Sequence, residues 1–175
     1  MSPDEVLDFW FRETPRELWF ARDPGFDAAI AARFGALHAE LARAIPPEWW
    51  TGARPRLATI IVLDQFSRKL YRDDPRAFAQ DAAARLVTRM AIAAGDEAVL
   101  NADERQFLYM PLMHSEALAD QHACVARFAA LGEPDPLAYA EEHRAVVARF
   151  GRFPARNAAL GRASTPEELS FLASS

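Results

Sequence analysis

Cysteine is almost absent from the sequence, in which Cys124 is the one thiol among 175 residues. A single cysteine forms no internal disulfide, and it cannot supply the thiolate cluster of a structural metal site. The longest strongly apolar stretch, residues 57–63, is far shorter than the roughly 20 residues that a membrane-spanning helix needs. We therefore expect a cytoplasmic protein with no cofactor, no metal ion, no targeting signal and no membrane partner.

Positive charge is scarcer than negative charge, with 20 lysine and arginine residues against 25 acidic residues and a formal net charge of −5. Nonspecific affinity for nucleic acid depends on lysine and arginine side chains clustered against phosphates, so we expect no nucleic-acid partner. The catalytic templates GxSxG, GxxxxGK(S/T), GxGxxG and HExxH are also missing. The sequence therefore assigns no catalytic residue, and it leaves the oligomeric state open.

Strand signals are lacking, whereas the signals that begin and end helices are frequent. Proline fits the first position of a helix, directly after an N-cap side chain that accepts a hydrogen bond from the backbone. Five pairs have this form: Ser2-Pro3, Asp23-Pro24, Asp74-Pro75, Asp135-Pro136 and Thr165-Pro166. Capping-box spacing joins Ser2 to Glu5 and Asn101 to Glu104, and Gly95, Gly132 and Gly151 stand where left-handed residues close helices.

These signals predict an all-α fold of antiparallel helix pairs, with about seven helices in a single domain over residues 1–175. The predicted helices span residues 3–12, 24–44, 55–72, 75–94, 102–131, 136–150 and 166–173, with a short helical turn near 155–160. Apolar residues recur at helical spacing in two of them: Ile30, Phe34, Leu37 and Leu41, and Phe78, Ala82, Leu86 and Met90. Pro111 predicts a kink or a break in the helix over 102–131.

Aromatic residues occur in three adjacent pairs, Phe9-Trp10, Trp19-Phe20 and Trp49-Trp50. Large rings dominate the energetics of protein cores, so we interpret these pairs as anchors between helices. An aromatic ligand cage is the alternative interpretation.

Charged side chains lie on an otherwise apolar helix face in the stretch LATIIVLDQFSRKLYRD, residues 57–73. Asp64, Arg68 and Tyr71 follow one another at spacings of four and three, with Gln65 next to them. Two interpretations of Asp64 and Arg68 stay open. The first is an exposed ion pair that contributes about 0.2–0.5 kcal/mol, and the second is a partly buried pair that needs further hydrogen-bond partners.

Histidine and acidic residues lie close together in FLYMPLMHSEALADQH, residues 107–122. On a helix, His114 and Glu116 would occupy nearly opposite faces, whereas His114 and Gln121 would share a face but make a poor metal site. Glu116 is either an inward-facing acid or an ordinary solvated glutamate. We interpret the histidines as structural, with His38, His114 and His143 in core or boundary positions and His122 at the surface.

Five blocks of the sequence together resemble a family of uncharacterised bacterial proteins classed as tetratricopeptide-like. The blocks are VLDFWF at 6–11, LDQFSRKLYR at 63–72, AFAQDAAA at 77–84, ERQFLYMPLMHSE at 104–116 and HRAVVARFGRFPARNAALGR at 143–162. The resemblance spans residues 5–172 and implies an array of antiparallel helix pairs, a scaffold used elsewhere for peptide and protein recognition. It names no activity. The chain departs from the family at Ala155, where histidine is frequent, and at Lys69, where asparagine is usual.

Four arginines and no acidic residue occur in RFGRFPARNAALGR, residues 149–162. Arg149 is in the last turn of a predicted helix, where a cation interacts favourably with the helix dipole by about 0.3–1 kcal/mol. Arg152, Arg156 and Asn157 lie in the following turn, where guanidinium groups can bind carboxylate or phosphate. Their partners are either a ligand or acids of the other blocks, namely Asp64, Asp81, Glu104 and Glu116. We predict that Arg152 and Arg156 face a polar cleft shared with Asp64, Arg68 and Glu116.

Three functional hypotheses follow from these patterns. The favoured one is a binding module that captures an anionic small molecule or the carboxylate of a peptide or protein. Its candidate ligand-binding residues are Asp64, Gln65, Arg68, Tyr71, Glu104, His114, Glu116, His143, Arg152, Arg156 and Asn157. The second is a hydrolase-like or lyase-like enzyme with Asp64 or Glu116 as general base and His114 as proton shuttle. The third is a protein-interaction scaffold without a discrete pocket.

Overall fold

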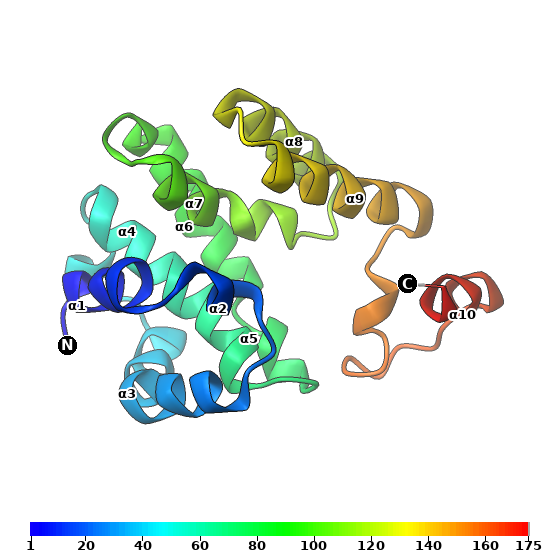
Figure 1. Cartoon of the computed structure of the whole chain (residues 1–175), viewed down its shortest axis with the longest axis horizontal. Coiled ribbons are helices and arrows are strands. Elements are labelled where there is room, and N and C mark those ends of the chain that lie inside the picture. Colours follow the sequence, from blue (N-terminus) through cyan, green and yellow to red (C-terminus); the bar gives the residue numbers. More distant parts are fainter. Residues whose placement is uncertain (175) are drawn as a thin grey trace. The chain divides into compact units, whose positions relative to one another are not determined.

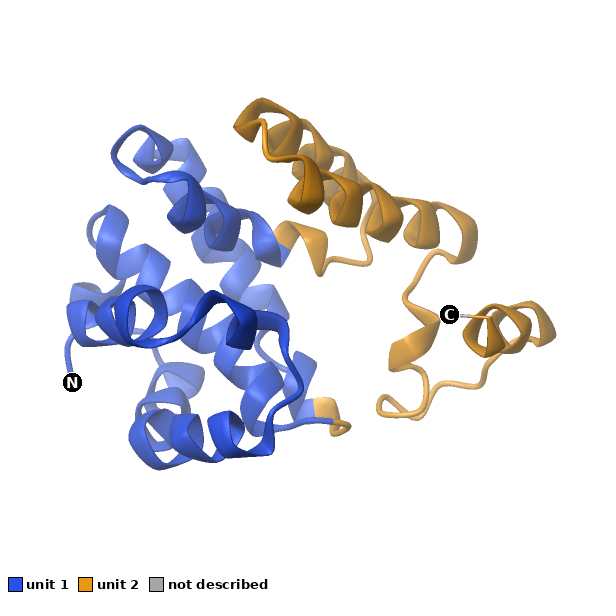
Figure 2. Ribbon diagram, viewed as in Figure 1, with its two compact units in different colours: residues 1–72, 76–111 blue, residues 73–75, 112–175 orange. Residues whose placement is uncertain are grey.

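The computed structural model describes residues 1–174, and all regular elements within them are helical (Figure 1). The predicted all-α fold class is therefore confirmed. The chain divides into two compact units, shown in Figure 2. Unit 1 comprises Met1–Arg72 and Arg76–Pro111, and unit 2 comprises Asp73–Pro75 and Leu112–Ser175. The single domain over residues 1–175 stays a prediction, and the two units are described in turn.

Unit 1 contains most of the α-helices and two π-helical turns. Its α-helices are α1 (Pro3–Asp8), α2 (Arg16–Phe20), α3 (Pro24–Arg43), α4 (Ala53–Ile60), α5 (Ser67–Leu70), α6 (Asp81–Ala93) and α7 (Ala102–Met113), the last of which ends in unit 2. The π turns are η1 (Phe9–Glu13) and η3 (Ile61–Phe66), and the 3-10 turns are η2 (Pro47–Trp49), η4 (Pro75–Phe78) and η5 (Asp96–Val99). Short elements such as α2 and η2 lack their own capping signals, and the sequence did not predict them.

Helix α3 buries the apolar face that its sequence predicts. Ile30 and Phe34 are fully buried, and Leu37 and Leu41 are nearly so. The buried apolar face predicted for the helix over 75–94, which included Leu86, is wrong. Residues 75–78 form a separate 3-10 turn, α6 begins only at Asp81, and Leu86 on α6 is 59% exposed. The buried face of α6 consists of small and β-branched residues, Ala84, Val87, Thr88 and Ala91, which allow α6 to approach α4 closely.

Aromatic rings form much of the core of unit 1. Trp10 and Trp19 both contact the buried ring of Phe107 edge-on, at centroid distances of 5.4 and 5.0 Å. The interpretation of the aromatic pairs as core anchors is confirmed for Phe9, Trp10, Trp19 and Trp49. It is wrong for Phe20 and Trp50, which are 61% and 42% exposed.

Helices α4 and α5 form one continuous helix from Ala53 to Leu70, interrupted by the π turn η3. A π turn pairs residues five apart and so accommodates one additional residue. The predicted helix over 55–72 is confirmed within two residues at each end, but a π turn has no sequence signal. All six residues of η3 are buried, Asp64 and Gln65 included.

His38 connects α3 to the start of α5. The Ser67 hydroxyl donates to the Leu63 carbonyl at 2.6 Å, so His38 Nε2, 2.7 Å away, is the donor to Ser67 Oγ. Burial lowers the pKa of His38 below its usual value. The prediction of a core histidine is confirmed, although Nδ1 finds no hydrogen-bond partner among residues 1–174.

Unit 2 is built from α8 (Leu118–Leu131), α9 (Pro134–Phe150), the 3-10 turn η6 (Pro154–Arg156) and α10 (Pro166–Ala173). Helices α8 and α9 pack together as a hairpin, and Cys124 and Phe128 of α8 are buried. Burial raises the pKa of the Cys124 thiol to about 12. Helix α9 begins at Pro134 after Glu133, so the start predicted at Asp135-Pro136 is wrong.

The chain breaks between α7 and α8, as Pro111 predicts. Pro111 itself is inside α7, and α7 ends two residues later at Met113. Gln121 of α8 is fully buried, and its amide donates to the carbonyls of Met113 and Ser115 at 2.7 and 2.6 Å. The carbonyls at the end of a helix have no backbone donor within the helix, and the Gln121 side chain supplies one here.

Several predicted helix ends are confirmed by the structure. Ser2 with Glu5 and Asn101 with Glu104 form reciprocal capping hydrogen bonds. Gly95, Gly132 and Gly151 have φ angles of 75°, 81° and 69°. Within residues 1–174, no helix combines the length and the apolarity that crossing a membrane requires.

Candidate functional site

The candidate residues divide between the two units. Asp64, Gln65, Arg68, Tyr71 and Glu104 belong to unit 1, and His114, Glu116, His143, Arg152, Arg156 and Asn157 belong to unit 2. The cleft that Arg152 and Arg156 would share with Asp64, Arg68 and Glu116 stays a prediction. Each group is described within its own unit.

Arg68 is the centre of a charged network in unit 1. Its guanidinium lies 3.1 Å from Asp64 Oδ1 and donates to both oxygens of Asp81, at 3.0 and 3.1 Å. The same group donates to the Asp64 carbonyl at 2.9 Å. The Gln65 amide donates to the other Asp64 oxygen at 2.6 Å. The partly buried interpretation of the Asp64 and Arg68 pair is therefore confirmed.

Tyr71 and Glu104 have separate surroundings. The Tyr71 ring meets the edge of His38 at a centroid distance of 5.4 Å, and the Arg76 guanidinium lies 4.5 Å from its centroid. Glu104 accepts from the Asn101 backbone at 2.9 Å and from Arg54 at 3.3 Å. Both residues therefore contact neighbouring residues of unit 1, and their part in ligand binding stays a prediction.

Lys69, which stands where the family usually has asparagine, is a buried charged residue. Its ammonium donates to the carbonyls of Leu18 and Ala21, at 3.1 and 2.8 Å, and lies 5.1 Å from the Phe26 centroid. Burial, assisted by the nearby Arg72, lowers the pKa of Lys69 to about 8. Lys69 binds the carbonyls at the end of α2, which is a structural role.

Glu116 is held by the loop after α9. Both of its oxygens accept from Arg162, at 2.8 and 2.9 Å, and one also accepts from the Phe153 backbone at 2.8 Å. Burial alone would raise the pKa of Glu116, but the hydrogen bonds from Arg162 and Phe153 outweigh it, so the pKa lies below its usual value. Glu116 is therefore an inward-facing, ionised acceptor.

Arg152 forms a two-pronged ion pair with Glu168 of α10. The two hydrogen bonds measure 2.6 and 2.8 Å, and a third goes to the Ala163 carbonyl at 2.8 Å. Asn157 is also buried and donates to the same carboxylate at 3.3 Å. The internal-network interpretation is thus confirmed for Arg152, but Glu168 was not among the four acids proposed as its partner. Glu168 lies beyond the family's signature blocks, so nothing in them pointed to it.

We expect the Glu168 ion pair to dominate the acid sensitivity of unit 2. The hydrogen bonds from Arg152 and the Thr165 backbone lower the pKa of Glu168 to about 2 from an ordinary 4.5. A lowered pKa stabilises the folded state fully above pH 4.5, and this contribution disappears as the pH falls from 4.5 to 2. Glu168→Gln should lower the melting temperature at pH 7 and flatten its decline below pH 4.5.

The adjacent Glu167 offers a matched control. Its side chain is 62% exposed and pairs with Arg149 at 2.8 Å. Because an exposed ion pair contributes little, Glu167→Gln should leave both the melting temperature and its pH profile nearly unchanged. Parallel melting profiles for Glu168→Gln and the parent chain between pH 7 and 2 would contradict the expectation.

Arg162 has the largest number of partners in the loop after α9, although it was not among the candidate residues predicted from the sequence. Besides Glu116, it donates to the Asn157 side chain at 2.9 Å and to the Phe153 carbonyl at 3.0 Å. It is the last residue of the arginine-rich block, so the sequence shows its charge. Its partners could not be predicted, because the loop after α9 has to fold back toward Glu116 before they meet. Arg152 and Arg162 together fix the turn that carries Arg156.

A further set of side chains, here named the Arg156 cluster, comprises His114, His143, Phe153 and Arg156. Arg156 donates to the His114 carbonyl at 2.8 Å, and its guanidinium lies 4.6 Å from the Phe153 centroid. His143 meets the Phe153 ring edge-on at 5.5 Å. Burial lowers the pKa of His143, and the positive charges of His114 and Arg156 lower it further, although a hydrogen bond to the Tyr139 carbonyl acts in the opposite sense. Three groups that carry or can acquire positive charge thus converge here.

The expected helical placement of His114, Glu116 and Gln121 is wrong. His114 and Glu116 lie in the irregular segment between α7 and α8, so no helix faces relate them to Gln121. The reason is that Pro111 and Gln121 end α7 at Met113. Among the residues that the structure describes, no group of three or more histidine, cysteine or acidic side chains is arranged to hold a metal ion.

Comparison with known proteins places the chain among proteins whose function is not established. The chain matches no curated protein. A solved structure titled as a protein of unknown function, ATU0120 from Agrobacterium tumefaciens, is 38% identical and superposes with a TM-score of 0.93. The match covers 99% of this chain and 97% of that one. The model of a bacterial family of unknown function, DUF924, matches residues 6–175, and the chain therefore belongs to that family.

Proposed function

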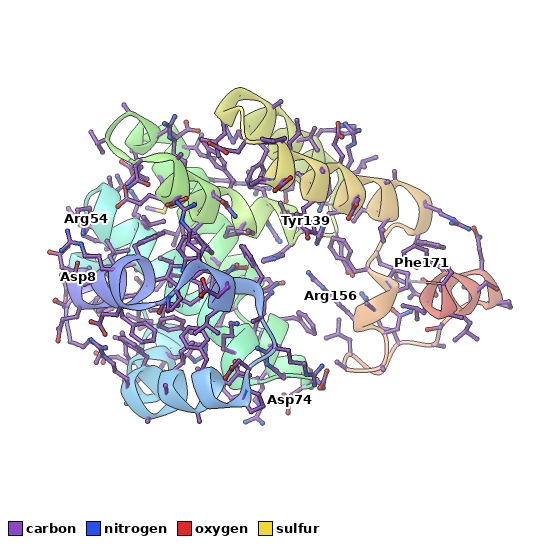
Figure 3. The ribbon with its side chains drawn as sticks, viewed as in Figure 1. Asp8, Arg54, Asp74, Tyr139, Arg156 and Phe171 are labelled. Atoms are coloured by element: carbon purple, nitrogen blue, oxygen red, sulfur yellow. The ribbon has the colours of Figure 1, made fainter. Side chains whose placement is uncertain are left out.

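We propose that the protein is a binding module that takes an anionic small molecule, or the carboxylate of a peptide, at the Arg156 cluster of unit 2. The observation that carries this proposal is the convergence of Arg156, His114 and His143. They come from the turn after α9, the segment before α8 and α9 itself. Figure 3 shows Arg156 extending from the turn that follows α9.

The electrostatics of the cluster favour an anion. Burial is the main reason that the pKa of His143 lies below its usual value, and the positive charges of His114 and Arg156 add to this lowering. A bound carboxylate or phosphate would reverse the sign of that interaction and favour the protonated imidazole. His143 already donates through Nδ1 to the Tyr139 carbonyl, so protonation would add Nε2 as a donor.

Arg152 and Arg162 have a supporting role in this proposal. Both form two-pronged ion pairs with internal carboxylates, Glu168 and Glu116. These pairs hold the turn of residues 151–162 in place and so fix the position of Arg156. A site whose positioning residues are themselves hydrogen-bonded loses less entropy when a ligand binds.

The acid/base enzyme alternative finds less support in this geometry. The Asp64 side chain is fully buried and accepts from Arg68 and Gln65. Glu116 is bound by Arg162 and has a lowered pKa, which makes it a poor general base near neutral pH. The packing of α8 against α9 supports a tetratricopeptide-like arrangement of helix pairs, which we include in the proposal together with a cytoplasmic location.

The proposal is tested by following the imidazole resonances of His143 by NMR during a pH titration. At constant ionic strength, replacing chloride with phosphate should raise the pKa of His143, because the bound dianion stabilises the imidazolium. Phosphate should also raise the melting temperature, by an amount that grows with RT ln(1 + [L]/Kd). Arg156→Met should abolish both responses.

Arg149 provides the control, because it repeats the local geometry of Arg156. Its guanidinium lies 4.7 Å from the Phe150 centroid, compared with 4.6 Å between Arg156 and Phe153. Arg149→Met should therefore leave the phosphate response intact. A pKa of His143 that is equal in chloride and phosphate, or a response that survives Arg156→Met, would refute the proposed function.

A further inference from the structure

We infer that His38 is an acid-sensitive switch in unit 1, and that protonation of its imidazole loosens α3 from the π turn η3 and from α5. Helix α3 packs against these two elements, and the hydrogen bond between His38 and Ser67 lies in their interface (Figure 1). The switch consists of residues of unit 1 and does not depend on the proposed function of unit 2.

One ring nitrogen of His38 has a hydrogen-bond partner, and the other has none. The side chain is 4% exposed, and Nε2 lies 2.7 Å from Ser67 Oγ, whose own proton goes to the Leu63 carbonyl. Nε2 therefore carries the proton of the neutral ring, and Nδ1 carries a lone pair. Within residues 1–174, no group donates to Nδ1. The neutral ring thus leaves one acceptor unsatisfied, which costs less than burying a charge.

Protonation would turn this acceptor into a charged donor. The imidazolium has an N–H group on each nitrogen, so Nε2 could still donate to Ser67, but Nδ1 would find no acceptor in the described part of the chain. A buried cation without a partner is strongly disfavoured. Solvation of the cation requires His38 to leave the interface, which breaks the hydrogen bond between α3 and Ser67, the first residue of α5.

The charged groups of the elements packed on α3 are engaged elsewhere. The ionisable residues of η3 and of residues 67–72 are Asp64, Arg68, Lys69, Tyr71 and Arg72. Asp64 and Arg68 pair with each other, and Lys69 and Arg72 both donate to the Ala21 carbonyl. These groups therefore supply no counterion to an imidazolium at His38.

Tyr71 is the ionisable side chain of this segment that meets the imidazole, at a centroid distance of 5.4 Å, and the Arg76 guanidinium lies against the tyrosine ring. A cation in that position disfavours a second positive charge. On α3 itself, the charged residues closest to His38 in sequence are exposed, namely Arg33, Glu40 and Arg43. Burial is the cause that lowers the pKa of His38 below its ordinary value of 6.5.

The lowered pKa sets the pH range of the switch. Well above pH 6.5, His38 is neutral in the folded and in the unfolded chain, so the folded state loses nothing to its burial. Below pH 6.5, the unfolded chain binds a proton that the folded chain does not bind, and stability falls with the pH. One proton raises the unfolding equilibrium constant by at most about tenfold per pH unit. Glu168 responds only below pH 4.5, so the two ranges are separate.

Urea unfolding of the full chain at pH 7.5 and 5.5, followed by tryptophan fluorescence, tests the switch. The four tryptophans, Trp10, Trp19, Trp49 and Trp50, all belong to unit 1, whereas His143, which also has a lowered pKa, belongs to unit 2. Between these pH values, the unfolding constant of the parent chain should rise about tenfold more than that of His38→Gln. The glutamine amide can donate to Ser67 but does not titrate.

His122→Gln is the matched control, because His122 is exposed on α8 and belongs to unit 2. This variant should keep the pH dependence of the parent chain. Protection of the α3 amides against hydrogen exchange should also fall between pH 7.5 and 5.5 in the parent chain and stay constant in His38→Gln.

Nitrogen NMR of the parent chain gives a measurement that does not require a folded variant. The ring of His38 should show a proton on Nε2 and stay neutral from pH 7.5 to 5.5 in the folded protein. An imidazole that titrates near pH 6.5 while the chain stays folded would overturn the inference. So would an equal pH dependence of the unfolding constant, or of the α3 protection, in the parent chain and in His38→Gln.

Discussion

Replacing Arg68 with methionine is expected to lower the free energy of unfolding by about 3–5 kcal/mol, the range for a buried charge that loses its partner. The Asp64 side chain is fully buried and lies 3.1 Å from the guanidinium. Asp81, which is 13% exposed, loses the same donor. Methionine keeps most of the apolar stem, so the loss measures the two carboxylates left without their cation. Urea unfolding at pH 7 gives the value directly.

Asp8 and Arg12 form a matched control for this prediction. They have the same four-residue spacing and the same 3.1 Å separation, but their side chains are 43% and 76% exposed. Arg12→Met should therefore change the free energy of unfolding by no more than about 0.5 kcal/mol. Similar losses for Arg68→Met and Arg12→Met would show that burial of the Asp64 network contributes nothing to its strength.

Gln121→Leu is expected to cost about 2–4 kcal/mol, because one carbonyl at the end of α7 and one just after it lose their donor and stay buried. The Gln121 amide donates to Met113 and Ser115 at 2.7 and 2.6 Å. Leucine has a similar volume and removes the donor without leaving a large cavity. The urea midpoint of the variant should fall while the dependence of stability on urea concentration stays constant.

Gln106 on α7 serves as the control for the same chemical change. Its side chain is half-buried and makes no hydrogen bond within the part of the chain that the structure describes. Gln106→Leu should leave the urea midpoint close to that of the parent chain. If both variants unfold at the parent midpoint, the Gln121 amide does not hold the break between α7 and α8.

Local signals were sufficient for most of the helices and for several of their ends. The cap at Asp23, the left-handed glycines and the break caused by Pro111 each depend on a few adjacent residues. The exposed stripe of α6 shows the limit of such reasoning. The large apolar residues predicted the wrong buried face of α6, because the face that packs against α4 contains the small residues Ala84 and Ala91.

The candidate site was less predictable, because its contacts join segments far apart in the sequence. The charge of Arg152 was evident, but its partner Glu168 became identifiable only when the chain folded back at residues 153–165. The central position of Arg162 depends on the same return of the chain. His143 is predictable as a boundary residue, whereas its proximity to Arg156 follows from tertiary structure alone.

The π turn at Ile61–Phe66 gives this buried helix an unusual tolerance of changes in chain length. Insertions and deletions are normally confined to surface loops, because a helix that gains one residue rotates everything after it. A π turn absorbs one residue, so removing one from Ile61–Phe66 would restore regular α-helix and leave α4 and α5 in place. If the residue removed is Gln65 or Phe66, the four-residue spacing of Asp64 and Arg68 is lost as well, so the helix would survive a deletion that breaks this ion pair.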